Sequence, residues 1–492
     1  MRSDDTAETA DRMTTGVPGL DTLLAGGLLR RSSAIVQGAP GSGKTVLANQ
    51  IAFHQTSRGT GVLYVTLLTE THAALLRHMR SFTFFNGAAV GESLVYVSGF
   101  QALRESTSAL LTVLQQELLA RRPGLLVIDG IGSIRELHGA SSLRQFLHEL
   151  QTSAETANCT CILISANAEP PSPEDAVVDA IIFMCETHLG LRSIRQLRIN
   201  KSRGTPHIHG LHTIMIGQDG LTAYPRLEAL YRTPSRPIED TGARARFEQS
   251  ALDEMLGGGL GVGSSTLLLG ATGTGKTLMG LSFLAAGLRG GEPAMYSGFY
   301  EALPRVLASA ESIGLGLRAH VDAGLLHADW VAPLELSLDV WGHQLLEAVR
   351  LQRPTRLFID GFNALYDGAA YPERLTACLT ALLNELRARG VTTLMSAELH
   401  PIIGPDVDVP VAGVSPMVEN TILLRYVELR AHLFRLITVL KVRGSWHEIA
   451  MREFRINATG IDVAPTFDSA EAILSGSARL QDRHETDERN GR

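Results

Sequence analysis

Short apolar runs alternate with amphipathic stretches along most of this chain. Residues 33–37, 125–128 and 265–269 form apolar runs of strand length, while residues 143–150 and 375–386 place apolar side chains at helical spacing. Strands that alternate with helices predict a mainly parallel twisted sheet with helices on both faces. The pattern therefore indicates an α/β fold.

A set of sequence landmarks occurs twice, in the same order. Residues 38–45 read GAPGSGKT and residues 270–277 read GATGTGKT. Each copy also has an apolar run that ends in Asp-Gly, followed later by a Lys-x-Arg-Gly tetrapeptide. These lie at 125–130 and 201–204 in the first copy and at 357–361 and 441–444 in the second. Repetition of this kind indicates two copies of one domain.

Prolines mark the boundary between the copies. Three of them stand in a short polar stretch, at positions 225, 234 and 237, and proline disfavours regular structure. Both ends of the chain are polar and are expected to be disordered. The expected order is a disordered start, a first domain, a linker, a second domain and a disordered polar tail, at residues 1–12, 13–225, 226–242, 243–476 and 477–492.

Each glycine-rich segment has the context of a P-loop, because an apolar strand precedes it and a helical pattern follows. Glycines let backbone N–H groups turn toward a phosphate, and the helix adds its positive end. We therefore expect two tandem RecA-like P-loop NTPase domains that bind ATP. The expected ATP-binding residues are Gly38, Gly41, Ser42, Gly43, Lys44 and Thr45, and Gly270, Gly273, Thr274, Gly275, Lys276 and Thr277.

The side chains of the two P-loops also predict a catalytic cation and a magnesium site in each copy. Lys44 and Lys276 are expected to reach the β- and γ-phosphates. Magnesium prefers oxygen ligands, such as a P-loop hydroxyl and the aspartate that ends a later strand. The predicted Mg²⁺ ligands are Thr45 and Asp129 in the first copy and Thr277 and Asp360 in the second.

The two copies differ in the residue that could act as a catalytic base. Hydrolysis needs a carboxylate that orients or deprotonates the attacking group. In the second copy Glu301 follows an apolar strand. The first copy has Leu68 and Thr69 at the matching positions, and Glu70 lies one residue further on. We predict that the first site binds ATP durably and turns it over slowly, while the second is the better catalyst.

These motifs resemble the KaiC family of RecA-like ATPases. The resemblance extends over residues 13–480 and is sharpest at the P-loops, at residues 15–21 (TGVPGLD) and at residues 441–447 (KVRGSWH), which follow ILLRYVE at 422–428. It implies a double-ring homohexamer with ATP at each subunit interface, acting through signalling or clock-type protein partners. It also implies cations that reach the neighbouring subunit's nucleotide, namely Lys201, Arg203, Lys441 and Arg443.

The chain departs from the family pattern at several places. Members carry two adjacent glutamates in each copy, at the positions of Leu68 and Thr69 and of Tyr300 and Glu301. This chain keeps Glu301 alone. Asp367 stands where the family has an arginine. The family also phosphorylates a Ser-Thr pair, matched here by Ser415 and Pro416. Ser415 is therefore a candidate phosphoacceptor in an autokinase reaction, and the alternative is that it serves as a turn residue.

Charge disfavours a DNA-acting RecA-like recombinase or helicase, which is the main alternative. The net charge is −7, and nucleic-acid affinity comes largely from Lys and Arg. Residues 165–191 and 396–424, where this fold places its DNA-binding loops, contain neither residue type. A nucleotide-gated scaffold without turnover stays open as a further alternative.

The remaining features are read as structural. No apolar run approaches the about 20 residues of a membrane span, and the start of the chain has no signal pattern. We therefore expect a cytoplasmic protein without membrane contact. Cys159 and Cys161 are interpreted as buried thiols rather than zinc ligands, and His207, His209 and His212 as surface histidines rather than a metal site.

Overall fold

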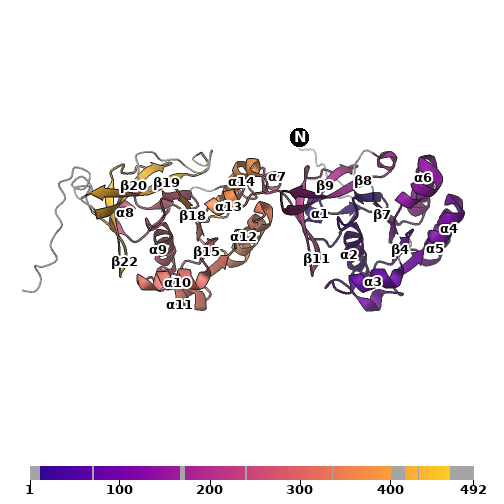
Figure 1. Cartoon of the computed structure of the whole chain (residues 1–492), viewed down its shortest axis with the longest axis horizontal. Coiled ribbons are helices and arrows are strands. Elements are labelled where there is room, and N and C mark those ends of the chain that lie inside the picture. The colour runs from indigo at the N-terminus through magenta and orange to yellow at the C-terminus, as the bar shows by residue number, and fades with distance from the viewer. Residues whose placement is uncertain are drawn as a thin grey trace, which may run out of the picture. The chain divides into compact units, whose positions relative to one another are not determined.

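The structure is a computed structural model that describes residues 11–68, 71–166, 172–238, 241–334, 336–399, 416–429 and 432–465. The chain forms two compact units, Met1–Leu230 and Tyr231–Arg492. Each unit is built around a nine-stranded sheet that carries helices (Figure 1). The expected α/β class, with two tandem RecA-like domains, is confirmed.

The first unit holds the first P-loop. Its strands are β1 (Arg12–Met13), β2 (Leu28–Leu29), β3 (Ser33–Gly38), β4 (Val62–Thr66), β5 (Leu94–Ser98), β6 (Leu125–Asp129), β7 (Thr160–Ser165), β8 (Ala180–Leu189), β9 (Arg192–Ser202), β10 (His212–Gly217) and β11 (Gly220–Tyr224). Its helices are α1 (Leu20–Leu23), α2 (Lys44–Ser57), α3 (His72–Met79), η1 (Gly87–Ala89), α4 (Phe100–Glu105), α5 (Thr107–Arg121), α6 (Gly132–Thr156), η2 (Pro173–Ala176) and α7 (Leu227–Leu230).

The second unit repeats this series. Its strands are β12 (Arg244–Ala245), β13 (Leu260–Gly261), β14 (Ser265–Gly270), β15 (Ala294–Gly298), β16 (Leu326–Trp330), β17 (Arg356–Asp360), β18 (Thr392–Glu398), β19 (Asn420–Leu429), β20 (His432–Val442), β21 (Arg452–Asn457) and β22 (Gly460–Val463). Its helices are α8 (Ser250–Met255), α9 (Lys276–Arg289), α10 (Leu303–Ser312), α11 (Leu317–Asp322), α12 (Leu338–Gln352), α13 (Asn363–Asp367), η3 (Pro372–Arg374) and α14 (Leu375–Ala388).

The two large sheets have the same strand order. It runs β5-β4-β6-β7-β3-β8-β9-β10-β11 in the first unit and β16-β15-β17-β18-β14-β19-β20-β21-β22 in the second. The strands from β5 to β8 are parallel, and β9, β10 and β11 extend the sheet in antiparallel fashion. The P-loop strands β3 and β14 are therefore central, with a parallel neighbour on each side.

The alternation of side chains along β3 explains why helices cover both faces of the first sheet. Ala34 and Val36 pack into the same core as Leu47 of α2. Ile35, between them, packs into a second core with Leu114 of α5. Successive residues of a strand point to opposite faces. The three successive apolar residues of β3 are therefore buried on both sides of the sheet.

A short helix lies where the prolines predicted none. The helical turn α7 falls within the expected linker, and the boundary between the two units follows it at Leu230. Leu227 is fully buried, and the backbone N–H of Arg226 donates to Nδ1 of His212 at 3.0 Å. Burial and this hydrogen bond stabilise a turn that composition alone did not indicate. His212 is therefore buried, contrary to the expectation of a surface histidine.

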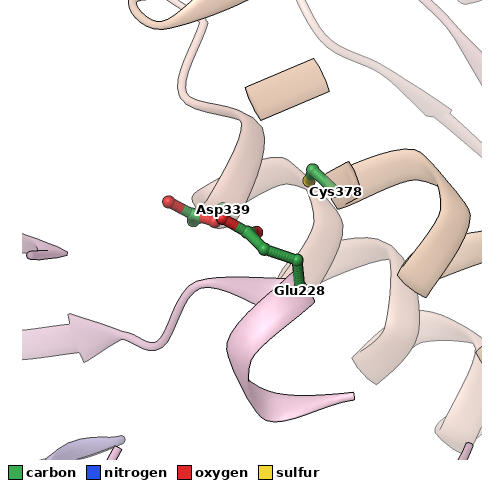
Figure 2. A group of neighbouring side chains, drawn as sticks. All are labelled: Glu228, Asp339 and Cys378. Carbon is green, nitrogen blue, oxygen red and sulfur yellow. The ribbon is translucent and has the colours of Figure 1, made fainter. Parts of the chain in front are cut away.

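Buried polar and thiol groups in both units have structural roles. Cys159 and Cys161 are buried free thiols. In the second unit, Asp339 on α12 and Cys378 on α14 are neighbouring side chains (Figure 2). Both are buried. The guanidinium of Arg374 donates to both carboxylate oxygens of Asp339, at 2.8 and 3.0 Å. A paired geometry of this kind compensates for the burial of the carboxylate.

No helix within the described ranges combines the length and apolar character that a membrane span requires.

Candidate nucleotide sites

Each P-loop joins a central strand to a helix through a glycine in the left-handed region. Gly43 precedes α2 with φ 98°, and Gly275 precedes α9 with φ 103°. A Cβ at Gly43 would lie 2.5 Å from Cδ1 of Ile216, and a Cβ at Gly275 would lie 2.7 Å from Cδ1 of Ile456. Both the backbone conformation and the lack of space require glycine here.

The P-loop lysines turn back onto their own loops. Nζ of Lys44 donates to the carbonyl of Ala39 at 2.7 Å. Nζ of Lys276 donates to the carbonyls of Gly270 and Ala271, both at 2.8 Å. Burial lowers the pKa of both lysines, against the opposing charges of nearby carboxylates. A phosphate group would supply the negative partner that these buried ammonium groups need.

A hydroxyl and a carboxylate lie together in each site, as a magnesium ion requires. Oγ1 of Thr45 donates to Asp129 at 3.2 Å, and Oγ1 of Thr277 donates to Asp360 at 2.9 Å. Burial raises the pKa of Asp360, so a bound cation would favour its ionised form. The donor set is made of hard oxygen atoms, which fits Mg²⁺.

Neighbouring hydroxyl groups hold the two aspartates in place. The hydroxyl of Tyr64 donates to Asp129 at 3.1 Å. Ser396 donates to Asp360 at 2.5 Å, and Tyr296 donates to the same carboxylate at 3.4 Å. Burial raises the pKa of both tyrosines well above the ordinary value, so they stay neutral hydrogen-bond donors at physiological pH.

The second P-loop opens into a cavity of about 820 Å³ that contains the predicted catalytic base. Lys276, Thr277, Asp360 and Glu301 all line this cavity. Burial is the main cause of the raised pKa of Asp360, and its hydrogen bonds oppose this shift. The nearby charge of Glu301 raises the pKa of Asp360 as well. The second site therefore brings together the residues predicted to bind phosphate, to bind the metal and to act as the base.

Leu68 occupies the place in the first site that Tyr300 occupies in the second. A Cβ at Gly130 would lie 2.8 Å from Cδ2 of Leu68, and a Cβ at Gly361 would lie 2.6 Å from Cδ2 of Tyr300. Both side chains thus lie over the glycine that follows the predicted metal-ligand aspartate. The residues that come next in the first copy, Thr69 and Glu70, lie outside the described residues.

Glu398 is a site residue that sequence reasoning did not assign to the site. It pairs in register with Gly270, at the first residue of the P-loop. Its carboxylate accepts a hydrogen bond from Oγ1 of Thr272, and its charge opposes the lowered pKa of Lys276. The signal was available, because parallel strands end at one edge of a sheet, where ligands bind.

Two further residues contact the second P-loop from the antiparallel hairpin. The hydroxyl of Tyr426 donates to the carbonyl of Gly273 at 2.6 Å, and Nε of Arg435 donates to the same carbonyl at 3.4 Å. The guanidinium of Arg435 also lies 5.6 Å from the centre of the Tyr426 ring. The stretch at 422–428 contains Tyr426 but gave it no role at the P-loop, and no motif contained Arg435. Both residues come from β19 and β20, far along the chain from the P-loop.

The cations expected to act on a neighbouring subunit contact loop carbonyls of their own unit. Nζ of Lys201 donates to the carbonyl of Asp175 at 2.7 Å, and Arg203 donates to the carbonyl of Ala176 at 3.1 Å. In the second unit, Nζ of Lys441 donates to the carbonyl of Val418 at 2.8 Å. The backbone N–H of Arg443 donates to the carbonyl of Glu419 at 3.0 Å. The candidate phosphoacceptor Ser415 lies outside the described residues.

Asp367 places a negative charge beside the second site. It ends α13, and its charge contributes, after burial, to the raised pKa of Tyr300. The resemblance implied an arginine here in other members. At this position the second site carries an anion rather than a cation that could stabilise charge on a transferred phosphoryl group.

Comparison with known proteins places the chain in a family. A model of the KaiC ATPase family matches residues 13–228 and 250–467. The circadian clock oscillator protein KaiC of Parathermosynechococcus lividus is 27% identical over 491 residues, covering 97% of this chain and 89% of the relative. The circadian clock oscillator protein KaiC 1 of a Synechocystis strain is 26% identical over 495 residues, covering 97% and 93%. This chain, with its two P-loop units, belongs to the KaiC ATPase family.

Proposed function

We propose that this protein hydrolyses Mg-ATP slowly at its second site and holds ATP at its first site to support assembly. The observation that carries the proposal is the difference at the rim of the two sites. Glu301 lines the cavity of the second P-loop, whereas Leu68 lies over Gly130 in the first. A leucine cannot accept a proton, so the first site lacks a base at the described position.

The residues of the second site divide the chemistry among them. Lys276 would bind the β- and γ-phosphates once these replace the loop carbonyls that it now contacts. Thr277 and Asp360 would hold Mg²⁺, which neutralises charge on the phosphates when it is bound. Glu301 would orient the attacking water and take its proton. General-base assistance of this kind contributes roughly 100-fold or more in rate.

The proposed assembly is a homohexamer in the cytoplasm, in which cations from one subunit reach the nucleotide of the next. Lys201, Arg203, Lys441 and Arg443 are the residues proposed for this role. The clock proteins among the relatives support signalling or clock-type protein partners for this chain as well. The two stretches at 165–191 and 396–424, which contain neither Lys nor Arg, disfavour nucleic acid as a partner.

Autophosphorylation is a second proposed activity of the second unit. Ser415 would accept the γ-phosphoryl group of ATP on its hydroxyl oxygen, the bond to the β-phosphate oxygen would break, and Glu301 would take the hydroxyl proton. The exposed carboxylate of Glu301 in an open cavity favours this reaction. Phosphopeptide mapping after incubation with Mg-ATP tests it, and a Ser415→Ala variant with unchanged phosphate incorporation would contradict it.

The experiment that tests hydrolysis is phosphate release by the purified full chain with Mg-ATP, with the oligomer sized in the same buffer. We expect slow release that Glu301→Gln lowers by about 100-fold, because the amide cannot accept a proton. Glu311→Gln, on helix α10, serves as a control for loss of a glutamate elsewhere in the second unit. An ATP-dependent ring without release would identify a nucleotide-gated scaffold instead.

A further inference from the structure

A buried glutamine stands immediately before the first P-loop. Gln37 lies near the end of β3, next to Gly38, and is 1% exposed. Its Nε2 donates to Oδ1 of Asp175 at 2.7 Å and to Oγ of Ser172 at 3.1 Å. Both acceptors belong to the short helix η2 and its N-cap. The end of β3 that leads into the P-loop is therefore hydrogen-bonded to the segment that precedes β8.

The same segment holds the cation that we assign to the neighbouring subunit's nucleotide. Asp175 contacts Gln37 through its carboxylate and accepts a hydrogen bond from Nζ of Lys201 on its carbonyl oxygen. The next carbonyl, of Ala176, accepts a hydrogen bond from Arg203. One residue, Asp175, thus connects the strand that ends at the P-loop with Lys201.

Internal contacts hold this segment in one conformation. The backbone N–H of Ser172 donates to Oδ2 of Asp175 at 2.9 Å, and the Ser172 hydroxyl donates to Oδ1, also at 2.9 Å. At the far end, Oδ2 of Asp179 accepts hydrogen bonds from the backbone N–H and the hydroxyl of Ser33, at 3.0 and 3.1 Å. Residues 172–179 are therefore anchored at both ends of β3.

The fold itself does not require a glutamine at this position. The residue that precedes the second P-loop is Leu269, which is equally buried in a strand with the same pairing. Within the described ranges, Oε1 of Gln37 has no hydrogen-bond partner, and burial of an unsatisfied amide oxygen costs stability. In the second unit Lys441 donates to the loop carbonyl of Val418, although no glutamine precedes that P-loop. Gln37 therefore points to a role beyond packing.

We propose that Gln37 is a positioning residue that holds Lys201, through Asp175, in the place from which it reaches the nucleotide of the neighbouring subunit in the first ring. This inference rests on the proposed role of Lys201. Gln37 itself touches no nucleotide. Its amide fixes Asp175, and the carbonyl of Asp175 in turn fixes the ammonium group of Lys201. Orientation of a charged donor before the ligand binds lowers the entropy that binding must overcome.

The test measures how fast bound ATP leaves the first site of the assembled full chain. Lys276→Ala in every protein restricts retained nucleotide to the first P-loop, and a chase with unlabelled ATP follows loss of radiolabelled ATP. We expect Gln37→Leu and Lys201→Ala each to accelerate this loss by about tenfold, as for the loss of a hydrogen bond to a charged group. The double variant should lose ATP no faster than Lys201→Ala alone, because the glutamine acts through the lysine.

A matched control separates positioning from stability. Gln55 is also 1% exposed and donates to the carbonyl of Thr14 at 2.6 Å. Gln55→Leu should lower the melting temperature at least as much as Gln37→Leu does, without accelerating ATP loss. Additive acceleration in the double variant with Lys201→Ala would overturn the proposal.

The positioning role of Gln37 and the proposed role of Lys201 can be tested separately. Unchanged ATP loss in Gln37→Leu, with faster loss in Lys201→Ala, would overturn the positioning role and leave the proposed function intact. Unchanged loss in Lys201→Ala would overturn both.

Discussion

The two nucleotide sites share a scaffold and differ at its rim. In each, a lysine lies against P-loop carbonyls and a threonine donates to a strand-end aspartate. The second site adds Glu301 and Glu398. The first site has Leu68 over Gly130, in the place that Tyr300 occupies in the second. The difference teaches that ATP binding depends on backbone shape and a few polar groups. Catalysis depends on one or two side chains that can change while the fold stays the same.

The support around the two sites differs as well. In the first unit, Tyr96 donates to Oδ1 of Asn49 at 2.7 Å, and Nδ2 of Asn49 donates to the hydroxyl of Tyr64 at 3.2 Å. Tyr64 in turn donates to Asp129. A closed polar network of this kind makes a rigid site. Rigidity suits a site that keeps its nucleotide, so the comparison predicts tight binding in the first unit and turnover in the second.

The largest expected effect comes from removing one P-loop lysine at a time. Lys276→Ala should lower phosphate release by about 100-fold or more, because the γ-phosphate loses its main cation. Lys44→Ala should leave most of the release and instead weaken ATP-dependent assembly. Phosphate release and oligomer sizing on both variants check this, and comparable turnover in the two would break the comparison.

A smaller effect should follow when the first site receives a carboxylate. Thr69→Glu gives the first copy the residue type of Glu301 at the matching sequence position. In a Lys276→Ala background, which silences the second site, we expect phosphate release to rise by about tenfold. Thr69→Gln is the control, since it has the same size without a base. A rise in both variants, or in neither, would show that Glu301 is not what separates the sites.

The smallest effect concerns stability. The second unit buries Arg356 at the start of β17, whereas the first unit has Leu125 at the start of the matching strand β6. Arg356 is 4% exposed, and its guanidinium donates to Glu292 at 2.8 and 3.2 Å. Glu292→Gln should lower the free energy of unfolding of the second unit by about 1 kcal/mol at pH 7, a modest value because Glu292 is partly exposed. Urea unfolding monitored by a probe in the second unit measures it.

The pH dependence of that loss has a definite sign. The hydrogen bond from Arg356 lowers the pKa of Glu292 below the ordinary value. The stabilisation is therefore fully present above the ordinary carboxyl range and is lost as the pH falls through the lowered pKa. The difference between the two proteins should shrink below pH ~4. The control is Glu347→Gln, at an exposed ion pair with Arg350. It should leave the free energy of unfolding unchanged at neutral and at acidic pH. A difference for Glu292→Gln that does not depend on pH would contradict the role of the Arg356–Glu292 ion pair.

Local sequence was sufficient for the parts of the sites that depend on local backbone. The P-loops, their lysines and the strand-end aspartates could be predicted, because glycine spacing and apolar runs specify a strand, a turn and a helix over a few residues. The same reasoning did not predict the helical turn α7 or the burial of His212. Both depend on contacts between segments that are distant in the sequence.

By itself, the sequence determined the two-copy organisation, the α/β class, the P-loops and the absence of a glutamate at the two matching positions of the first copy. Only the tertiary structure placed Glu398 beside Thr272 and joined Gln37 to Lys201 through Asp175. The physical reason is that a motif records neighbours along the chain, whereas these contacts join residues from different strands and from the segments between them. Which residues meet there depends on strand order and register, which are fixed when the whole sheet packs.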